Sequence, residues 1–242
     1  MIHLQGITLV FSGPAGVVCA INDLSLRIRD GETLALVGTS GCGKSSTLKI
    51  INGLLRPTRG AVFFDGERLD ASNVFAARLR MGYVIQGAAL FPHLTVRENI
   101  AVMAKILGLP KAQTAERISR LLTLVGLDEK RFADQYPLAL SGGEQQRVGV
   151  ARALMLDPPC LLMDEPFGAL DVITRHQLQN DFARLKQKLK KTVVFVTHDL
   201  EEAFKLADRV AVMHQGKIMQ VDAPEKIRNQ PANDFVREFL RL

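Results

Sequence analysis

The residues best suited to chemistry lie in a glycine-rich segment that follows an apolar run. Residues 38–46 read GTSGCGKSS, and residues 38–45 match the pattern GxxxxGK[ST]. Phosphate oxygens need many short N–H contacts, and glycine lets the backbone wrap closely enough to supply them. Lys44 adds a positive charge that reaches the β- and γ-phosphates, and the Ser45 hydroxyl is placed to bind Mg²⁺. The predicted phosphate contacts are Gly38, Ser40, Gly41, Cys42, Gly43, Lys44, Ser45 and Ser46.

Two carboxylates and a histidine also follow apolar runs. Asp164 and Glu165 come directly after CLLM, and His198 comes after VVFVT. A buried strand ending in Asp places that side chain at the carboxyl edge of the sheet, where open α/β folds bind ligands. Asp164 would hold Mg²⁺ through water, and Glu165 would act as general base on an attacking water. His198 is interpreted as a cap or as a contact to the γ-phosphate.

A second anion site is predicted at residues 140–147, which read LSGGEQQR. Ser141 is a favourable helix N-cap, and the two glycines after it expose the first amides of the helix. Those amides lie at the positive end of the helix dipole and attract an anion. Taken as structure alone, the segment is a well-capped helix start. One chain thus has two predicted phosphate-binding sites but a single set of predicted catalytic carboxylates.

Strands alternate with helices in the segments that must position these residues. The run TLALV at 33–37 is typical of a strand buried on both faces of a parallel sheet. Apolar runs that read as strands recur from residue 160 onward, separated by helical patterns, which predicts a parallel sheet with helices on both faces. Helical periodicity dominates residues 95–126 instead. We therefore predict an α/β core at 1–87 and 151–242, interrupted by a helical subdomain at 88–150.

With these motifs in order, the sequence resembles the ABC ATPase family over essentially its whole length. LSGGEQQR is similar to the family's signature motif, and the segment Gly168-Ala-Leu-Asp171 is similar to its D-loop. Gln86 and His198 stand where the family has its Gln-containing loop and its switch histidine. The resemblance implies a single domain, 1–242, with a P-loop NTPase (RecA-like) core, an N-terminal antiparallel β region and an inserted α-helical subdomain.

The resemblance also implies an ATP hydrolase that uses Mg²⁺ and works as a head-to-tail homodimer. The signature of one copy would close on the γ-phosphate held by the phosphate loop of the other. Gln86 would contact Mg²⁺ and the attacking water, Asp171 the partner's phosphate loop, and Phe11 the adenine ring. The predicted catalytic residues are Lys44, Gln86, Glu165 and His198; the metal ligands are Ser45, Gln86 and Asp164; the signature contacts are Ser141, Gly142, Gly143 and Glu144.

Two stretches carry a closer resemblance. Residues 82–100 and 157–179 look like the ATPases of importers for glycine betaine, choline and related quaternary-amine osmoprotectants, although relatives in that group often have Gln in place of Gly87 and Glu144. Some also have a C-terminal regulatory module, which we do not expect in a sequence that ends at Leu242. The implied partners are an integral membrane permease and, indirectly, a substrate-binding protein, with the chain peripheral at the cytoplasmic face of the inner (plasma) membrane. The alternative is an importer of amino acids or other small solutes.

Composition and charge limit the partners and protein classes that these motifs could indicate. The formal net charge is +6, but the basic residues are spread along the chain, so we expect solvated helix faces and no nucleic-acid partner. A DNA-repair ABC ATPase would need a long coiled coil between its phosphate loop and signature, and the stretch from Ser45 to Ser141 is too short. Apolar tracts fall far below the roughly 18 residues that span a bilayer, and the N-terminus lacks the features of a secretory signal. A membrane role would therefore come through a partner.

The three cysteines are widely spaced, which indicates neither a disulfide framework nor a zinc site and fits a reducing cytoplasm. Cys42 lies beside Lys44 and a predicted helix N-terminus, two features that lower the pKa of a thiol. We therefore consider two hypotheses: a reactive thiol whose alkylation blocks ATP binding, and an inert packed thiol.

Overall fold

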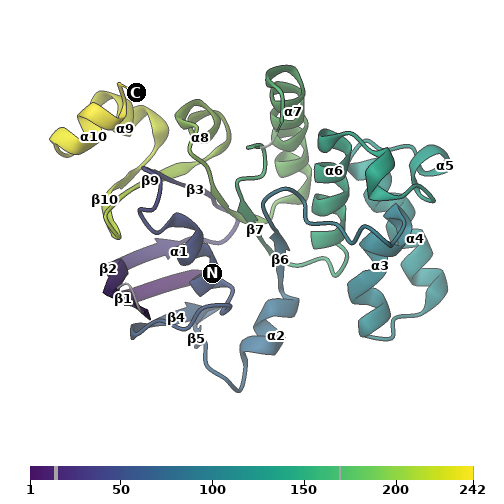
Figure 1. The fold of residues 1–242 in the computed structure, drawn as a ribbon, viewed down its shortest axis with the longest axis horizontal. Coiled ribbons are helices and arrows are strands. Elements are labelled where there is room, and N and C mark those ends of the chain that lie inside the picture. The colour runs from purple at the N-terminus through teal and green to yellow at the C-terminus, as the bar shows by residue number, and fades with distance from the viewer. Residues whose placement is uncertain (14–15, 169, 242) are drawn as a thin grey trace. The chain divides into compact units, whose positions relative to one another are not determined.

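The protein, described by a computed structural model, divides into two compact units (Figure 1). The first contains residues 1–78 and the chain from 191 onward, and the second contains residues 79–190. The structure describes residues 1–13, 16–168 and 170–241. Ala169 of the predicted D-loop and the terminal Leu242 therefore lie outside the described residues.

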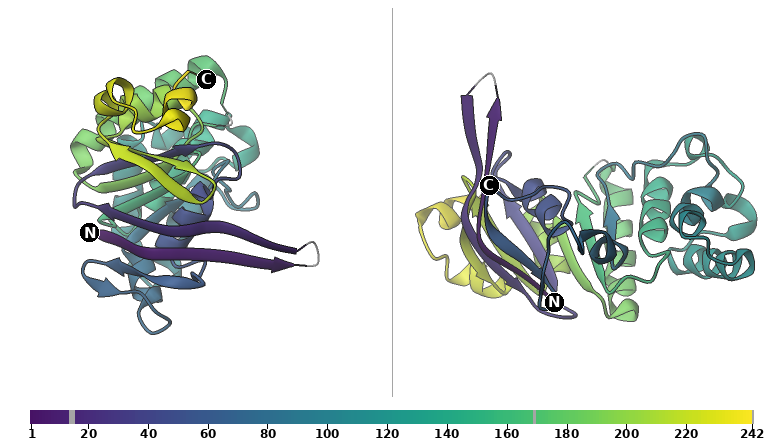
Figure 2. Two further views of the ribbon diagram at one scale, coloured as in Figure 1. Left: turned by 90° about the vertical axis from the view of Figure 1, so that its left-hand side faces the viewer. Right: turned by 90° about the horizontal axis from the view of Figure 1, so that it is seen from below.

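An antiparallel sheet forms one part of the first unit, as predicted for the N-terminal region. Its strands are β1 (Ile2–Gly13), β2 (Gly16–Ile28), β4 (Arg59–Phe64) and β5 (Glu67–Arg68), in the order β2-β1-β4-β5. Near-alternate residues of β1 are buried, namely Ile2, Leu4, Ile7 and Leu9. The hairpin of β1 and β2 extends beyond the other strands of this sheet (Figure 2).

The remaining strands of the first unit run in the order β10-β9-β3-β8. They are β3 (Thr33–Gly38), β8 (Thr192–Val196), β9 (Arg209–His214) and β10 (Lys217–Asp222). Strand β3 is parallel to both β8 and β9, and every residue of β3 and β8 is buried. The helices are α1 (Lys44–Ile51), α2 (Val74–Leu79), α8 (Leu200–Leu206), α9 (Pro224–Asn229) and α10 (Asp234–Phe239). The predicted α/β core with a doubly buried central strand is confirmed.

Helices dominate the second unit, together with the parallel strands β6 (Met81–Val84) and β7 (Cys160–Asp164). The helices are α3 (Val96–Ile106), α4 (Lys111–Leu124), α5 (Glu129–Phe132), the 3₁₀ turn η1 (Pro137–Ala139), α6 (Gly142–Ala153) and α7 (Val172–Leu189). Helix α6 contacts α3, α4, α7 and β6. Among the described residues, we find no helix whose length and apolar character would let it cross a membrane.

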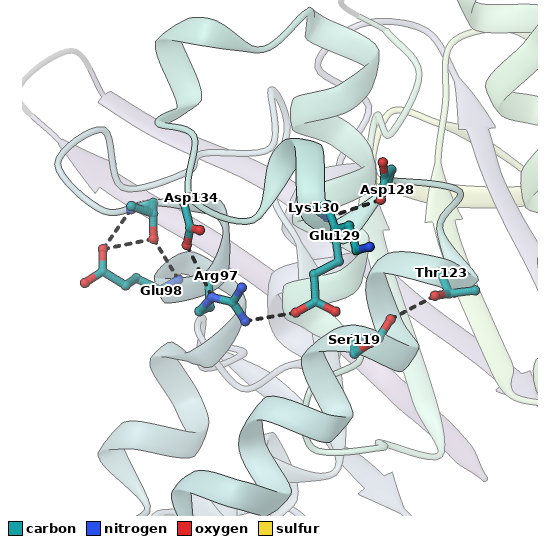
Figure 3. A network of polar contacts seen from close by, with 9 residues as sticks. Arg97, Glu98, Ser119, Thr123, Asp128, Glu129, Lys130 and Asp134 are labelled. Atoms are coloured by element: carbon teal, nitrogen blue, oxygen red, sulfur yellow. Dashed lines mark hydrogen bonds and ion pairs between the residues drawn. The ribbon is translucent and has the colours of Figure 1, made fainter.

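Charged side chains join the start of α3 to α5 (Figure 3). Arg97 Nη1 lies 3.0 Å from Glu129 Oε1, and Arg97 Nε lies 3.4 Å from Asp134 Oδ1. Hydrogen bonds from Ser119 and then from Arg97 hold the pKa of Glu129 below its usual value. Because these groups are partly exposed, their main effect is to orient α5 rather than to stabilise the fold strongly.

A buried asparagine fixes the loop that leads into α3. Asn99 is fully buried, and its Oδ1 accepts a hydrogen bond of 2.8 Å from the amide of Phe91. Its Nδ2 donates to the carbonyls of Phe91, Leu94 and Thr95 at 3.1, 2.9 and 3.0 Å. One buried side chain thus supplies hydrogen-bond partners to four backbone groups of the loop.

We expect Asn99→Ala to lower the free energy of unfolding by about 3 kcal/mol, because it removes the four hydrogen bonds that this buried side chain makes with the loop backbone. Urea denaturation of the variant measures the change. Asn180→Ala, at an exposed position of α7, is the matched control and should shift stability by less than about 0.5 kcal/mol. Equal midpoints for Asn99→Ala and the control would contradict the assigned role.

Candidate functional site

The phosphate loop connects β3 to α1, and its glycines adopt conformations that other residues avoid. Gly38, Gly41 and Gly43 have φ values of 152°, 75° and 104°. A Cβ on Gly38 would lie 2.2 Å from the carbonyl oxygen of Met213, and one on Gly43 would lie 2.5 Å from that of Ala20. Two of these glycines are therefore required by close backbone approach as well as by φ.

The first backbone amides of helix α1 carry partial positive charge. Gly43 is its N-cap, no side chain among the described residues caps it, and its first turn contains no acidic residue. The first amides of a helix have no intrahelical acceptor, and the helix dipole places partial positive charge there. The start of α1 therefore favours an anion such as a phosphate group.

Lys44 adds a full positive charge to the same loop. The side chain is 7% exposed, and its Nζ donates hydrogen bonds to the carbonyl oxygens of Gly38 at 2.8 Å and Thr39 at 3.0 Å. The ammonium group is thus held inside the loop by weak, neutral acceptors. A phosphate oxygen is a charged acceptor and forms the stronger bond, so it can replace a carbonyl partner.

The structure corrects the hypothesis of a reactive Cys42. The thiol is buried, and burial raises its pKa, although Lys44 and nearby hydrogen bonds act in the opposite direction. Desolvation disfavours the thiolate more than the neighbouring charge favours it. Of the two hypotheses, the structure favours the inert packed thiol; the sequence shows the neighbouring lysine but not the packing around the sulfur.

His198 and Phe11 belong to the same unit as the phosphate loop. His198 follows β8 and is exposed, whereas the cap of α8 is Asp199, which accepts hydrogen bonds from the amides of Glu201 and Glu202 at 2.8 and 3.1 Å. The helix-cap interpretation of His198 is therefore wrong. Phe11 is 44% exposed and pairs with Val18 in the β1–β2 hairpin, so its ring is accessible for stacking.

In the second unit, the buried strand β7 ends at the predicted acidic pair. Asp164 is only 7% exposed, and Glu165 follows with φ 44°, in the left-handed region. The structure brings Gln86 to this point: its Nε2 donates a 2.9 Å hydrogen bond to Glu165 Oε2. This bond orients the Glu165 carboxylate.

Tyr83 is a neighbour of the acidic pair that the sequence analysis missed. Burial, and then the charge of Asp164, raise the pKa of Tyr83 to about 12. Its hydroxyl has no hydrogen-bond partner among the described residues. A tyrosine in the otherwise apolar strand MGYV was the available signal. Tyr83 stays neutral at physiological pH and can donate a hydrogen bond beside Asp164.

The signature segment forms the start of α6, as predicted. Ser141 Oγ accepts a hydrogen bond from the amide of Glu144, and the Glu144 carboxylate accepts one from the amide of Ser141, which completes a capping box. Gly143 is buried, and a Cβ there would lie 2.6 Å from Thr174 Cγ2 in the first turn of α7. Asp171 caps that turn by accepting a 3.0 Å hydrogen bond from the Thr174 amide. The signature helix and the D-loop residue thus lie side by side.

Arg152, in the last turn of α6, holds the loop after Gln86 in place. Arg152 donates hydrogen bonds to the carbonyls of Ala88 at 2.7 Å and Ala89 at 2.9 Å. These alanines have φ values of 59° and 40°, which L-residues rarely adopt. Burial lowers the pKa of Arg152, but an arginine remains charged at any physiological pH. One side chain therefore clamps a strained loop that contains a predicted catalytic residue.

The predicted magnesium ligands fit that ion in their chemistry. The Ser45 hydroxyl, the Asp164 carboxylate and the Gln86 amide all offer oxygen atoms, which Mg²⁺ prefers. Across residues 1–13, 16–168 and 170–241, no three His, Cys, Asp or Glu side chains gather as a metal site. Mg²⁺ at nucleotide sites is typically held by one or two carboxylates, with water and phosphate oxygens supplying the rest.

The structure gathers the predicted residues into two groups, one in each unit. The phosphate loop, His198 and Phe11 belong to the first unit. The other group brings together Gln86 with Glu165, and the signature segment with Asp171. Sequence reasoning missed Tyr83 and Arg152, whose roles depend on contacts between segments distant in the chain.

Comparisons with known proteins point to one family. The profile described as "ABC transporter" matches residues 21–168. The glycine betaine/carnitine/choline transport ATP-binding protein OpuCA of Bacillus subtilis (strain 168) is 47% identical over 240 residues, 99% of this chain and 62% of OpuCA. The glycine betaine uptake system ATP-binding protein YehX of Escherichia coli (strain K12) is 46% identical over 239 residues, 99% of this chain and 76% of YehX. This chain thus spans 62% of the length of OpuCA.

A solved structure shares the fold. The dimeric, post-hydrolysis structure of the ATP-binding cassette MJ0796 with ADP and Pi matches with a TM-score of 0.83 at 33% identity, covering 93% of this chain and 99% of that chain. The fold and the glycine-rich helix starts define an ATP-binding cassette. This chain belongs to the ABC transporter family.

The buried, raised-pKa thiol of Cys42 should react slowly with alkylating agents. We expect iodoacetamide near neutral pH to label Cys42 at least about tenfold more slowly than the exposed Cys19, as mass spectrometry of the labelled peptides will show. Labelling of Cys42 at the rate of Cys19 would restore the hypothesis of a reactive thiol.

Loss of the Arg152 clamp should loosen the loop after Gln86. In Arg152→Met, we expect amide hydrogen exchange across residues 86–91 to become about tenfold faster, because two charge-assisted hydrogen bonds are lost. Arg120→Met, on the exposed face of α4, is the control and should leave this loop unchanged. Unchanged exchange in Arg152→Met, with α4 equally protected in both variants, would refute the clamp.

Proposed function

We propose that this chain binds and hydrolyses ATP as one half of a head-to-tail homodimer that powers a membrane importer. One observation carries the proposal: the chain has two glycine-exposed helix starts, at α1 and α6, but a single strand-end acidic pair. A second copy gives each phosphate loop a signature helix as its counterpart. The dimeric structure of the cassette MJ0796 with ADP and Pi supports this arrangement.

Each predicted site residue has one part in the proposed reaction. The α1 amides and Lys44 bind the phosphates, and Ser141, Gly142 and Gly143 of the other copy approach the γ-phosphate. Glu165 takes the proton of the attacking water, with its carboxylate oriented by Gln86. His198 contacts the γ-phosphate, and Phe11 stacks on the adenine. Ser45, Asp164 and Gln86 would hold Mg²⁺, which would supply charge neutralisation at the phosphates of the nucleotide.

We propose quaternary-amine osmoprotectants of the glycine betaine and choline type as the cargo, at the cytoplasmic face of the inner membrane. The names of OpuCA and YehX support this class. The partners are a membrane permease and, indirectly, a substrate-binding protein. Co-purification with the native permease, followed by ATPase assays with glycine betaine, choline and spermidine, tests the cargo. Stimulation by spermidine alone would redirect the assignment to another importer.

We expect Glu165→Gln to lower ATP turnover by at least about a hundredfold while retaining ATP binding, because the amide cannot accept the proton of the attacking water. The variant should accumulate as an ATP-bound dimer, which size-exclusion chromatography detects. Glu67→Gln, at an exposed position in β5, is the matched control and should turn over ATP normally. Turnover by Glu165→Gln at the wild-type rate would refute the general base, and full turnover by an isolated monomer would refute the shared site.

A further inference from the structure

The carbonyl groups of the phosphate loop need hydrogen-bond donors from around the loop. A loop that turns its amides toward a phosphate group points its carbonyls away from it, and buried carbonyls require partners. Lys44 supplies the donor for two of them, at Gly38 and Thr39. The carbonyl of the buried Cys42 accepts a 3.1 Å hydrogen bond from the amide of Gly216, in the turn between β9 and β10. This turn therefore supports the phosphate loop through its backbone.

The β9–β10 turn fits closely against its neighbours. Its two residues, Gln215 and Gly216, have φ values of 45° and 76°, in the left-handed region. Gly216 is buried, and a Cβ there would lie 3.0 Å from the carbonyl oxygen of Ala20 in β2. Just before the turn, the carbonyl oxygen of Met213 leaves no room for a Cβ on Gly38. A shift of the turn would therefore move backbone that touches the phosphate loop.

An aromatic stack joins the end of β9 to helix α10. The rings of His214 and Phe235 have centroids 3.9 Å apart and an interplanar angle of 27°. Phe235 also stacks on Phe239, which is buried. The Nδ1 atom of His214 makes no hydrogen bond with any residue that the structure describes. The ring face of His214 is therefore its contact with α10.

Helix α10 is anchored to the same sheet by contacts that do not involve this stack. The buried Gln220 of β10 accepts a 2.8 Å hydrogen bond from the amide of Ala232, and its Nε2 donates to the carbonyl of Gln230 at 3.1 Å. Asn233 caps α10 by accepting a 3.0 Å hydrogen bond from the amide of Val236, which is fully buried. The helix is thus a fixed support against which the end of β9 packs.

We propose that His214 and Phe235 are positioning residues for nucleotide binding, because their stacked rings hold the β9–β10 turn against the phosphate loop. The stack stabilises the arrangement in which the Gly216 amide meets the Cys42 carbonyl. Without it, the loop spends part of its time with its amides no longer converging on a phosphate group. Only the organised fraction binds, so the observed affinity falls with that fraction. This inference rests on the proposed binding of ATP and adds α10 as a determinant of its affinity.

Phe235→Leu removes the ring but keeps an apolar side chain on α10. We expect ADP, which carries phosphates but is not turned over, to bind this variant about fivefold more weakly, as isothermal titration calorimetry will show. Phe204→Leu is the matched control, because Phe204 is another half-buried ring of the same unit and contacts Arg228 on α9. The control should bind ADP with the wild-type affinity. Equal affinities for the two variants would overturn the proposal.

Variants of His214 test whether the two rings act together. His214→Leu should weaken ADP binding as much as Phe235→Leu does, whereas His214→Phe keeps a stacking ring and should stay within about twofold of the wild type. The double variant His214→Leu/Phe235→Leu should bind no more weakly than either single variant, because both changes break one stack. Losses that multiply in the double variant, or a His214→Phe variant as weak as His214→Leu, would contradict the assignment.

Amide hydrogen exchange in the nucleotide-free protein separates this inference from the proposed function. We expect the Gly216 amide to exchange about fivefold faster in Phe235→Leu than in Phe204→Leu, because its hydrogen bond to Cys42 opens more often. Equal exchange in the two variants would refute the stack as a support for the turn. A wild-type protein that binds no ADP, with the exchange difference intact, would instead refute the proposed function and leave the link between α10 and the loop standing.

Discussion

The rest of the nucleotide site depends on one electrostatic constraint: the first amides of α1 lack acceptors within their own helix. Without a side-chain cap or a first-turn carboxylate, the helix dipole at Gly43 is unopposed. Lys44 increases this positive charge while its ammonium rests on two backbone carbonyls. A phosphate group satisfies both the amides and the lysine, so the loop is organised before its ligand arrives.

Helix α6 connects several functional features of the second unit. Its first turn carries the signature glycines, which pack against the start of α7. Eleven positions after Ser141, Arg152 reaches the loop behind Gln86, and Gln86 in turn holds Glu165. A displacement of this one helix would therefore act on both the signature segment and Glu165, the proposed general base.

The sequence alone predicted those features of the site that depend on residue types at fixed local spacing. The φ values of Gly38 and Gly43, the buried strand β3 and the Ser141 cap all follow from residue types at fixed spacing. Contacts between distant segments could not be predicted in this way. In the sequence, Asn99 is a single polar residue within a helical pattern. In the structure, its side chain fixes the loop that precedes the helix. For the same reason the sequence left two hypotheses open for Cys42, because a sequence shows neighbouring charges but not desolvation.

The loop after Gln86 has an energetic consequence that its hydrogen bonds alone do not reveal. Ala88 and Ala89 both lie in the left-handed region, and such residues store about 1–3 kcal/mol each. Breaking the two hydrogen bonds to Arg152 would let these residues relax, so the strain would offset part of the cost of breaking the bonds. The strain at Ala88 and Ala89 therefore lowers the net cost of separating this loop from α6.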